Sequence, residues 1–504
     1  MNLEDAVTTT NFVAFDLGAS SGRAVLGRFN GDTLSLEVAH RFHNGPTRVL
    51  DTLYWNALQL FAEMQTGLGK AAERCGGRIA ALGVDTWGVD FGLLDKNGQL
   101  IGNPVHYRDS RTDGIMEKTF ELVPRAEIFN QTGIQFMQLN TLFQLAALAR
   151  QQSPALAAAD TLLFMPDLFN YWFTGQKVCE YTIASTSQAY NMRENRWAVE
   201  MLEKLGIPPG IFLDVTPPGA RVGSLLPHIA AGAGLSGEVP VIAPAGHDTA
   251  CAVAAVPVSA ADKNRFAYIS SGTWSLMGTE LPAPVITEKS LEYNVTNEGG
   301  VENTIRLLKN LGGLWLVQEC RRVWAQQGQE YSFAELAELA AAAPPFTGLI
   351  DPDAPDFFAP GDMPARIRDF CATHGQGTPD TPGQIIRTAL ESLALKYRWV
   401  LERLEELAGR RLEVLHIVGG GTQNKLLNQF AASATGRRVV TGPVEATAVG
   451  NILMQMLAVG QIGSLNEGRE VVKRSFPVEE YRPQNSAAWD AAYSRFLSLL
   501  ESGS

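Results

Sequence analysis

The sequence lacks a long apolar run, and this absence limits where the protein can work. No stretch of about 18 consecutive apolar residues, the length of a membrane-spanning helix, occurs in the chain of 504 residues. The first residues include the acidic Glu4 and Asp5, where a secretory signal would carry basic side chains. We therefore expect a protein without a membrane span that works in the cytoplasm.

Positive charge and cysteine are also scarce. Lys and Arg number 41 against 53 Asp and Glu, which gives a formal net charge of -12. The chain therefore has no overall positive field for phosphate backbones, so a small polar substrate is a better expectation than nucleic acid. The five cysteines are scattered without a C-x-x-C pair or histidines spaced for zinc. We expect reduced thiols, most of them in the core.

Two common nucleotide-binding motifs are missing where phosphate turns are expected. The Walker A spacing G-x-x-x-x-G-K-[ST] is absent, and the glycine-rich element at residues 414–427 lacks the dinucleotide motif G-x-G-x-x-G. What the chain does have is length and apolar content, with 504 residues of which 45% are hydrophobic, and this favours more than one domain. Nothing in the sequence indicates its oligomeric state.

A polar turn at residues 16–23 lies between two apolar segments near the start of the chain. Residues 11–15 and 24–29 read as strands, and residues 33–39 alternate between apolar and polar side chains. This pattern predicts a three-stranded antiparallel meander.

The same pattern returns near the midpoint of the chain. Residues 266–269 are apolar, residues 270–273 form a polar turn, and residues 274–278 resume an apolar strand. Two such openings half a chain apart predict two similarly built domains, with a ligand held between them. We expect these domains to span residues 1–257 and 258–504.

A glycine triplet, Gly419 to Gly421, marks the second half. It follows a predicted strand at 414–418 and precedes a predicted helix at 423–434, with further helices expected at 381–407 and 446–459. Glycines at a helix N-terminus allow a phosphate to approach the backbone at the positive end of the helix dipole. The triplet could hold the phosphate or ribose of a nucleotide, or it could be a purely structural turn.

The two polar turns are candidate phosphate sites. Small residues between Asp16 and Arg23 would let backbone N–H groups approach the β and γ phosphates of ATP, and Arg23 would add positive charge. Ser271-Gly272-Thr273 is the corresponding turn in the second half. Taken alone, each turn could equally be an ordinary hairpin.

Two further segments place polar side chains after buried strands. Residues 85–90, Asp-Thr-Trp-Gly-Val-Asp, follow the predicted strand 79–84 and combine carboxylates with an aromatic surface, which suits a sugar. Trp87 could instead be a core residue. The second segment, His247-Asp248-Thr249, lies between apolar runs. Asp248 could act as a functional carboxylate or merely as a helix N-cap.

Four of these strings, in their order and spacing, resemble the FGGY family of carbohydrate kinases over about residues 11–480. They are Asp16-Leu17-Gly18-Ala19-Ser20-Ser21-Gly22-Arg23, Gly246-His247-Asp248-Thr249, Ser270-Ser271-Gly272-Thr273-Trp274-Ser275 and Gly419-Gly420-Gly421-Thr422-Gln423-Asn424. Five further strings resemble the branch of the family that phosphorylates L-rhamnulose, namely residues 85–91, 107–112, 133–136, 296–300 and 308–310.

The resemblance implies an α/β fold with two ribonuclease-H-like, actin-like ATPase domains flanking a central cleft. It implies that the protein phosphorylates the C1 hydroxyl of L-rhamnulose with ATP and Mg²⁺, with the sugar and the phosphate turn in the N-terminal domain and the nucleotide in the C-terminal domain. Asp248 would accept the hydroxyl proton, and Asp16 would help to place Mg²⁺, through water. The implied sugar contacts are Gly88, His247, Asp248, Thr249 and Asn310, and the implied ATP contacts are Ala19, Ser20, Ser21, Gly22, Arg23, Thr273, Gln318 and Gly420.

The chain departs from the general family pattern at residues 140–145, Asn-Thr-Leu-Phe-Gln-Leu, where many members have a lysine followed by a tryptophan. Many of those members use other substrates, so this departure bears on the general family pattern more than on the rhamnulose branch. Two alternatives stay open. The substrate could be another ketose or deoxy sugar, such as L-fuculose or a pentulose. The protein could also be a catalytically silent actin-like sugar sensor.

Overall fold

The computed structural model describes residues 9–502, so Glu4 and Asp5 lie outside the described part of the chain. The chain forms two compact units. Unit 1 contains the residues up to Ala255 together with Glu280–Leu307 and Ala446–Ser475, and unit 2 contains Val256–Thr279, Leu308–Glu445 and the residues from Phe476 onward. The units differ from the expected division into 1–257 and 258–504, because two segments of the second half fold with the first.

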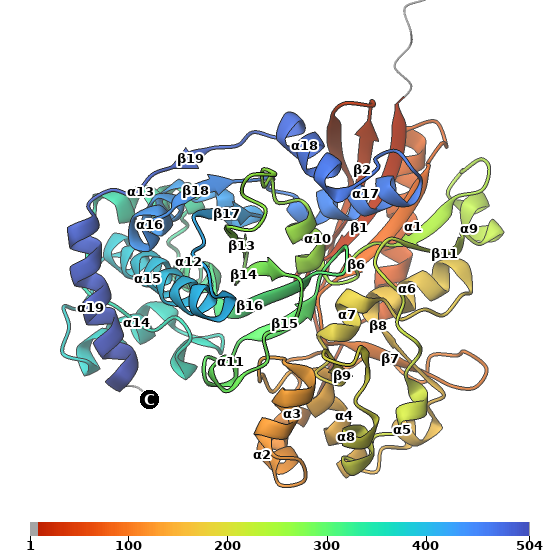
Figure 1. Ribbon diagram of the computed structural model, residues 1–504, viewed down its shortest axis with the longest axis horizontal. Helices are drawn as coiled ribbons and strands as arrows, with labels where there is room; N and C mark the ends of the chain where they lie inside the picture. The colour runs from red at the N-terminus through yellow and green to blue at the C-terminus, as the bar shows by residue number, and fades with distance from the viewer. Residues whose placement is uncertain (1–8, 503–504) are drawn as a thin grey trace, which may run out of the picture. The chain divides into compact units, whose positions relative to one another are not determined.

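The six-stranded sheet of unit 1 forms its centre (Figure 1). In spatial order its strands are β11 (Ala220–Ser224), β12 (Pro240–Ala243), β6 (Ala81–Thr86), β1 (Thr10–Leu17), β2 (Ser21–Phe29) and β3 (Leu34–His43). The antiparallel meander β1-β2-β3 is confirmed, and β6 pairs with β1 in parallel.

Helix α1 (Ala57–Arg74) shows how the sequence specifies one of these elements. Asn56 caps its first turn by accepting a hydrogen bond from the backbone N–H of Gln59. The buried side chains of Leu60, Met64 and Leu68 recur at helical spacing and face the core beside the sheet.

The remaining elements of unit 1 surround this sheet and extend it into a second cluster of buried apolar side chains. The strands are β4 (Thr47–Val49), β5 (Thr52–Tyr54), β7 (Phe91–Leu94), β8 (Thr161–Phe164), β9 (Tyr190–Asn191), β10 (Arg196–Trp197) and β15 (Thr296–Gly299). The helices are η1 (Ser110–Thr112), α2 (Ile115–Phe120), α3 (Arg125–Thr132), α4 (Thr141–Arg150), α5 (Pro154–Ala158), α6 (Met165–Thr174), α7 (Tyr181–Ser185), α8 (Val199–Lys204), η2 (Pro209–Ile211), α9 (Pro227–Gly232), α10 (Asp248–Ala254), α11 (Glu288–Glu292), α17 (Ala446–Ala458) and α18 (Leu465–Ser475).

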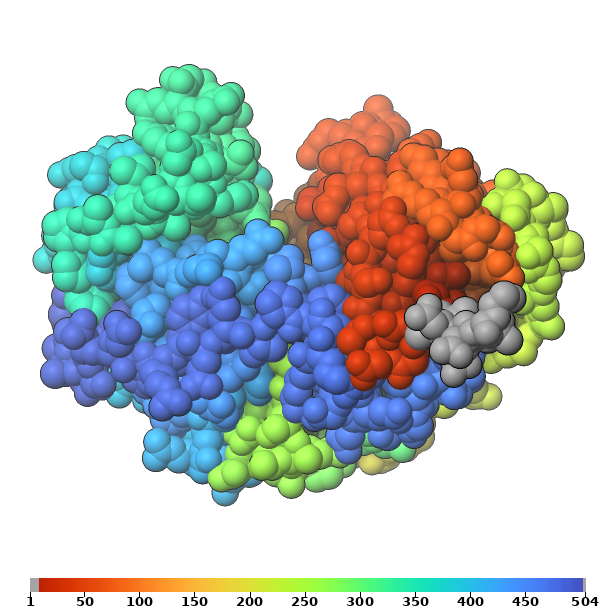
Figure 2. All heavy atoms as spheres, turned by 90° about the horizontal axis from the view of Figure 1, so that it is seen from above, coloured from red at the N-terminus to blue at the C-terminus, as the bar shows by residue number. Residues whose placement is uncertain are grey.

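Helix α17 belongs to unit 1 because it packs on β1, β6 and α10. Figure 2 shows atoms of the blue, C-terminal part of the chain lying against the red, N-terminal part. The packing is close. A Cβ atom on Gly450 would lie 1.8 Å from the carbonyl oxygen of Cys251, so only glycine fits there. Gln455 donates a hydrogen bond to the carbonyl of Val13, at 2.9 Å.

Unit 2 repeats part of the same arrangement. Strands β14 (Trp274–Leu281), β13 (Phe266–Ser271), β17 (Val414–Val418), β18 (Arg438–Thr441) and β19 (Glu480–Tyr481) lie side by side in that order. Strand β13 is antiparallel to β14 and parallel to β17, just as β1 is antiparallel to β2 and parallel to β6. The predicted strand-turn-strand opening of the second half is therefore confirmed.

Helix α15 (Pro382–Ala408) is the long helix of unit 2 and packs beside α13 and α16 (Figure 1). Thr381 and Gln384 form a capping box, and Gly409 ends the helix in the left-handed conformation. The other elements are β16 (Ile305–Gly312), which begins in unit 1, α12 (Trp315–Gln326), α13 (Phe333–Ala342), η3 (Pro355–Phe357), α14 (Met363–Thr373), η4 (Gly420–Gln423), α16 (Lys425–Thr435) and α19 (Ser486–Ser502).

Two expectations from composition can be compared with the structure. All five cysteines are free thiols, and four of them are buried, as expected. Within residues 9–502, no helix has both the length and the apolar character needed to cross a membrane.

Candidate active site

The end of β6 and the start of α10 bring predicted sugar residues together in unit 1. Thr86 forms a parallel bridge with His247, and its N–H donates to the carbonyl of Gly246 at 2.9 Å. A Cβ atom on Gly88 would lie 3.4 Å from Nε2 of His247, so any side chain at position 88 would crowd the imidazole. The structure thus places Gly88 directly beside His247.

Asp248 is the first residue of α10, and His247 occupies the N-cap position. The interpretation of Asp248 as an N-cap is therefore wrong. Its Oδ1 accepts a hydrogen bond from Oγ1 of Thr249 at 3.0 Å and lies 3.4 Å from Nε2 of His247. The side chain of Asp248 is 30% exposed, so a substrate can reach this carboxylate.

Two residues that the sequence did not single out hold the backbone of this site. Glu180, at the start of α7, accepts hydrogen bonds from the N–H of Gly246 at 2.9 Å and from Oγ1 of Thr182 at 2.7 Å. The N–H of His247 in turn donates to Oγ1 of Thr182 at 3.2 Å. Burial raises the pKa of Glu180, against the lowering effect of these hydrogen bonds. No local motif reveals this support, because Glu180 lies 66 residues before Gly246.

The first polar turn connects β1 and β2 and is held by its own backbone. The N–H of Gly18 donates to the carbonyl of Ser21 at 3.0 Å, and the side chain of Asn44 donates to the carbonyl of Gly18 at 2.7 Å. Asp16 and Arg23 face each other across the two strands, with Oδ2 and Nη2 3.1 Å apart. The predicted metal-placing residue is thus paired with a predicted phosphate contact.

A second carboxylate lies beside Asp16 in the sheet. Asp85 is its register partner on β6, is fully buried, and accepts a hydrogen bond at 2.6 Å from the side chain of Asn451 on α17. Burial and the negative charge of Asp16 raise the pKa of Asp85 well above its usual value, and the charge of Asp248 adds to this effect. Three carboxylates of unit 1 are therefore coupled electrostatically.

The segment after β6 is more of a scaffold than a sugar surface. Asp90 is fully buried and accepts hydrogen bonds from the indole N–H of Trp55 at 2.5 Å and of Trp87 at 3.0 Å. Burial raises the pKa of Asp90 to about 6, although these bonds act in the opposite direction. The rings of Trp55 and Trp87 lie 4.0 Å apart, and Trp87 is buried. The structure thus favours the core alternative for Trp87.

Val89 adopts a left-handed conformation, with φ of 69°, which is an outlier for a β-branched residue. Its N–H donates to Oγ1 of Thr186 at 3.1 Å, and its carbonyl accepts from Oγ1 of Thr141 at 2.6 Å. Gln144 donates to Asp90 at 2.9 Å. Thr141 and Gln144 come from residues 140–145, so the segment that departs from the general family pattern supports the turn that carries Gly88.

In unit 2 the second polar turn brings two predicted ATP residues together. Oγ1 of Thr273 donates to Oε1 of Gln318 at 3.2 Å, and the backbone of the turn anchors the start of α12. Asn310, the remaining predicted sugar contact, lies half-buried on the part of β16 that belongs to unit 2.

The glycine triplet packs against this turn. A Cβ atom on Gly421 would lie 1.9 Å from Oγ of Ser271, and Gly419 has a positive φ of 87°. Gly420 is exposed, and a Cβ atom there would meet nothing within 4 Å. The triplet leads into the 3-10 turn η4, and α16 begins at Lys425 rather than at the predicted Gln423. The predicted start of this helix is therefore corrected by two residues, and a 3-10 turn lies between the glycines and the α-helix.

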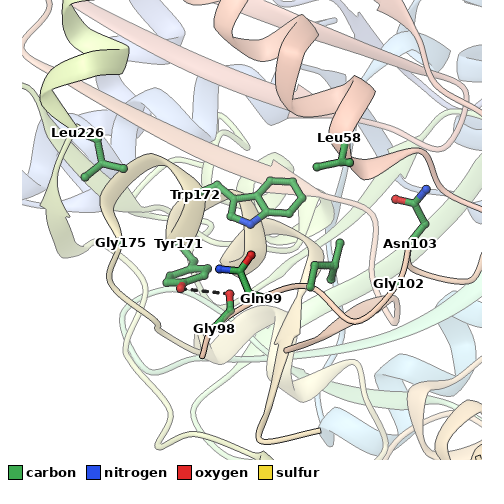
Figure 3. A pocket seen from close by; sticks show the side chains of 10 residues that line it. Leu58, Gly98, Gln99, Gly102, Asn103, Tyr171, Trp172, Gly175 and Leu226 are labelled. Carbon is green, nitrogen blue, oxygen red and sulfur yellow. Dashed lines mark hydrogen bonds between the residues drawn. The ribbon is translucent and has the colours of Figure 1, made fainter. Parts of the chain in front are cut away.

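A pocket of about 620 Å³ in unit 1 shares no residue with these candidates. Figure 3 shows Tyr171 and Trp172 of α6 facing Gln99 and Asn103, with Oη of Tyr171 donating to the carbonyl of Gly98 at 3.3 Å. The pocket is a separate surface feature.

Comparisons with known proteins agree with this architecture. The model of the FGGY family of carbohydrate kinases, N-terminal domain, matches residues 11–255, and that of the C-terminal domain matches residues 267–459. Solved structures of a gluconate kinase from Lactobacillus acidophilus (TM-score 0.80, 15% identity, 98% of both chains) and a xylulose kinase from Rhodospirillum rubrum (TM-score 0.79, 17% identity, 98% of both chains) have the same fold. The predicted α/β fold with two ribonuclease-H-like domains is thereby confirmed.

Curated relatives match along nearly the whole chain. A protein of Bacteroides thetaiotaomicron named rhamnulokinase is 49% identical over 97% of this chain and 99% of its own length. Another of that name from Oceanobacillus iheyensis is 38% identical over 93% of this chain and 97% of its own length. The chain therefore belongs to the FGGY family of carbohydrate kinases and, within it, to the rhamnulokinases.

Proposed function

We propose that the protein transfers the γ-phosphoryl group of ATP to the C1 hydroxyl of L-rhamnulose, giving L-rhamnulose 1-phosphate and ADP. The observation that carries this proposal is the accessible carboxylate of Asp248 at the start of α10, with His247, Thr249 and Gly88 around it. The names of the full-length relatives supply the sugar.

The mechanism follows from what phosphoryl transfer requires: alignment of the two substrates, neutralisation of phosphate charge and removal of the hydroxyl proton. Asp248 accepts that proton as the C1 oxygen attacks the γ-phosphorus. Gly88 leaves room for the sugar beside His247, and His247, Thr249 and Asn310 bind its hydroxyl groups.

Each unit has its own proposed contacts with ATP. The turn Ala19 to Arg23 receives the β and γ phosphates, and Arg23 contributes positive charge. In unit 2, the hydrogen-bonded pair Thr273 and Gln318 and the exposed Gly420 contact the nucleotide. Unit 1 thus serves the phosphates and most of the sugar, and unit 2 serves the nucleotide and supplies Asn310 to the sugar. We also propose that the reaction takes place in the cytoplasm.

The residues present fit a magnesium ion held mainly by the phosphates of ATP. Within residues 9–502, no three His, Cys, Asp or Glu side chains group into a metal cage. Mg²⁺ in kinases is commonly bound by one or two carboxylates together with substrate phosphates, and Asp16 offers such an oxygen next to the phosphate turn, with Asp85 beside it. Bound there through water, Mg²⁺ would neutralise phosphate charge.

A panel of ketoses assayed for MgATP-dependent ADP release tests this function. We expect L-rhamnulose to give the highest kcat/KM, above L-fuculose and the pentuloses. A higher kcat/KM for another ketose would show that this other ketose is the substrate. Sugar binding without ADP release from any of them would favour the silent sensor.

A further inference from the structure

A buried arginine and a buried glutamate lie behind the imidazole of His247. Both come from the segment Glu280–Leu307 that joins unit 1. Oε2 of Glu298, on β15, is 3.2 Å from Nδ1 of His247, and Nη2 of Arg306, on β16, is 3.2 Å from the same nitrogen. Nη2 of Arg306 is also 3.1 Å from Oε2 of Glu298. The three side chains form one charged cluster.

This cluster is unusual in how deeply it is buried. The side chain of Arg306 has an exposed fraction of 0%, and its Nε donates to the carbonyl of Gly299 at 2.8 Å. Burial alone would raise the pKa of Glu298, but the positive charge of Arg306 lowers it, so the carboxylate is held ionised. Burying an ion pair seldom adds net stability, because both charges lose their hydration. A buried pair that contacts an active-site ring is therefore a candidate for positioning that ring.

The geometry also indicates where the ring carries its proton. Guanidinium groups donate hydrogen bonds and cannot accept them, so Nη2 of Arg306 donates to Nδ1 of His247. Oε2 of Glu298, although 3.2 Å from that nitrogen, makes no hydrogen bond within residues 9–502. A neutral imidazole that accepts at Nδ1 has its proton on Nε2. That nitrogen faces Oδ1 of Asp248 at 3.4 Å, a long contact of the kind that tightens when substrate binds.

We propose that Arg306, held in place by its ion pair with Glu298, is a positioning residue that fixes the Nε2–H form of His247 and, through it, selects the reactive oxygen of Asp248. Oδ1 of Asp248 accepts a hydrogen bond from Oγ1 of Thr249 and faces Nε2 of His247. The remaining oxygen, Oδ2, is then the one that accepts the C1 hydroxyl proton. The catalytic part of this inference rests on the proposed function, whereas the placement of the ring proton does not.

The first test determines which ring nitrogen of His247 carries the proton, in the full-length protein without substrate. Two-dimensional ¹H–¹⁵N NMR of the imidazoles distinguishes the two neutral forms, and His247→Asn identifies the signals of His247 among the 7 histidines. We expect the Nε2–H form in the wild type and loss of this single form in Arg306→Lys and Glu298→Gln. An Nδ1–H ring in the wild type would overturn the inference, whether or not the protein proves to be a kinase.

The second test asks whether the effect on turnover passes through His247. Displacement of a catalytic group by about 1 Å can cost on the order of 100-fold, so we expect Arg306→Lys and Glu298→Gln to lower kcat by roughly 10- to 100-fold with little change in KM for ATP. In a His247→Asn background each change should have almost no further effect on kcat. An equal loss of kcat in the wild-type and His247→Asn backgrounds would show that these residues do not act through His247.

A matched control separates positioning from general destabilisation. Arg469 is buried in the same unit and pairs with Glu280 at 2.8 Å, so Arg469→Lys disturbs a similar buried ion pair. We expect a comparable fall in melting temperature for Arg469→Lys and Arg306→Lys, but a fall in kcat for Arg306→Lys alone. A similar fall in kcat for both would show that loss of a buried pair is sufficient, and the inference would fail.

Discussion

The two strand-turn-strand elements share a backbone arrangement but carry different chemistry. In unit 1, β1 and β2 end in a turn flanked by the ion pair Asp16–Arg23, with the buried carboxylate of Asp85 alongside. In unit 2, β13 and β14 end in a turn whose hydroxyl groups have neutral partners: Thr273 donates to Gln318, and Ser275 shares a hydrogen bond with Tyr397.

The difference indicates a division of work, in which two units with similar strand-turn-strand elements perform different parts of the reaction. An ionised carboxylate such as Asp16, paired with Arg23, suits the handling of a metal ion, whereas neutral hydroxyl and amide groups suit the orientation of a nucleotide. This division predicts that substitutions in unit 1 stop turnover but spare ATP binding and that substitutions in unit 2 weaken ATP binding. The opposite pattern would break the comparison.

The largest effect is expected for Asp248→Asn, which removes the proton acceptor of unit 1 while keeping the shape of the side chain. Because general-base catalysis contributes roughly 10²- to 10⁴-fold, we expect kcat to fall by at least about 100-fold, with ATP affinity little changed. Steady-state kinetics and calorimetry measure the two quantities. Asp369→Asn, an exposed change on α14, makes the same change of charge and should be silent. Near wild-type turnover of the Asp248→Asn variant would show that Asp248 is not the base.

The next effect is expected for Asp16→Asn. Loss of this carboxylate weakens the placement of Mg²⁺, so we expect kcat to fall by roughly 10- to 100-fold and half-saturation to require more Mg²⁺. A titration of rate against Mg²⁺ at fixed ATP measures this. An unchanged Mg²⁺ requirement would show that Asp16 serves only to pair with Arg23.

A smaller effect, and one confined to unit 2, is expected for Gly420→Val. The position opens into free space, so the substitution should be tolerated by the fold but should block close approach of the nucleotide. We expect KM for ATP to rise by roughly tenfold, about 1.4 kcal/mol, and sugar affinity to change little. Gly210→Val is a matched control, because its Cβ also meets nothing within 4 Å. Equal losses for both ligands in calorimetry would count against the division of work.

The smallest effect on catalysis is expected in the scaffold of unit 1, where a substitution changes the pH dependence of stability. The pKa of Asp90 is raised to about 6 in the folded protein, so the unfolded chain releases this proton first as pH rises. Stability is therefore fully present below about pH 4 and declines by roughly 3 kcal/mol through pH 6. Urea unfolding of the wild type and Asp90→Asn between pH 4 and 7 measures this contribution. If the free energy of unfolding falls equally with pH in both proteins, groups other than Asp90 cause the decline.

Much of the fold was predictable from local patterns. The turns at residues 16–23 and 270–273 were found because short polar segments interrupt apolar strands, and β17 was predicted with the observed bounds, Val414–Val418. The allocation of residues 280–307 and 446–475 to unit 1 was not predictable. It depends on side-chain packing of α17 on β1 and β6, which leaves no periodic signal in the sequence.

The candidate site was only partly predictable for the same reason. His247, Asp248 and Thr249 are neighbours in the chain, so a single motif marks all three. Their supports are distant in sequence: Glu180 holds the backbone of Gly246, and Arg306 reaches His247 across 59 residues. Such contacts become visible only when the chain is folded.

One measurement tests the central claim most directly: the identity of the phosphorylated product. The protein is incubated with MgATP and L-rhamnulose, ADP is quantified, and ³¹P and ¹³C NMR locate the phosphate on the sugar. We predict one ADP per product molecule, with ³¹P–¹³C coupling at C1, and no product with Asp248→Asn on the same timescale. Phosphate at another carbon, or ADP release without a phosphorylated sugar, would contradict the account.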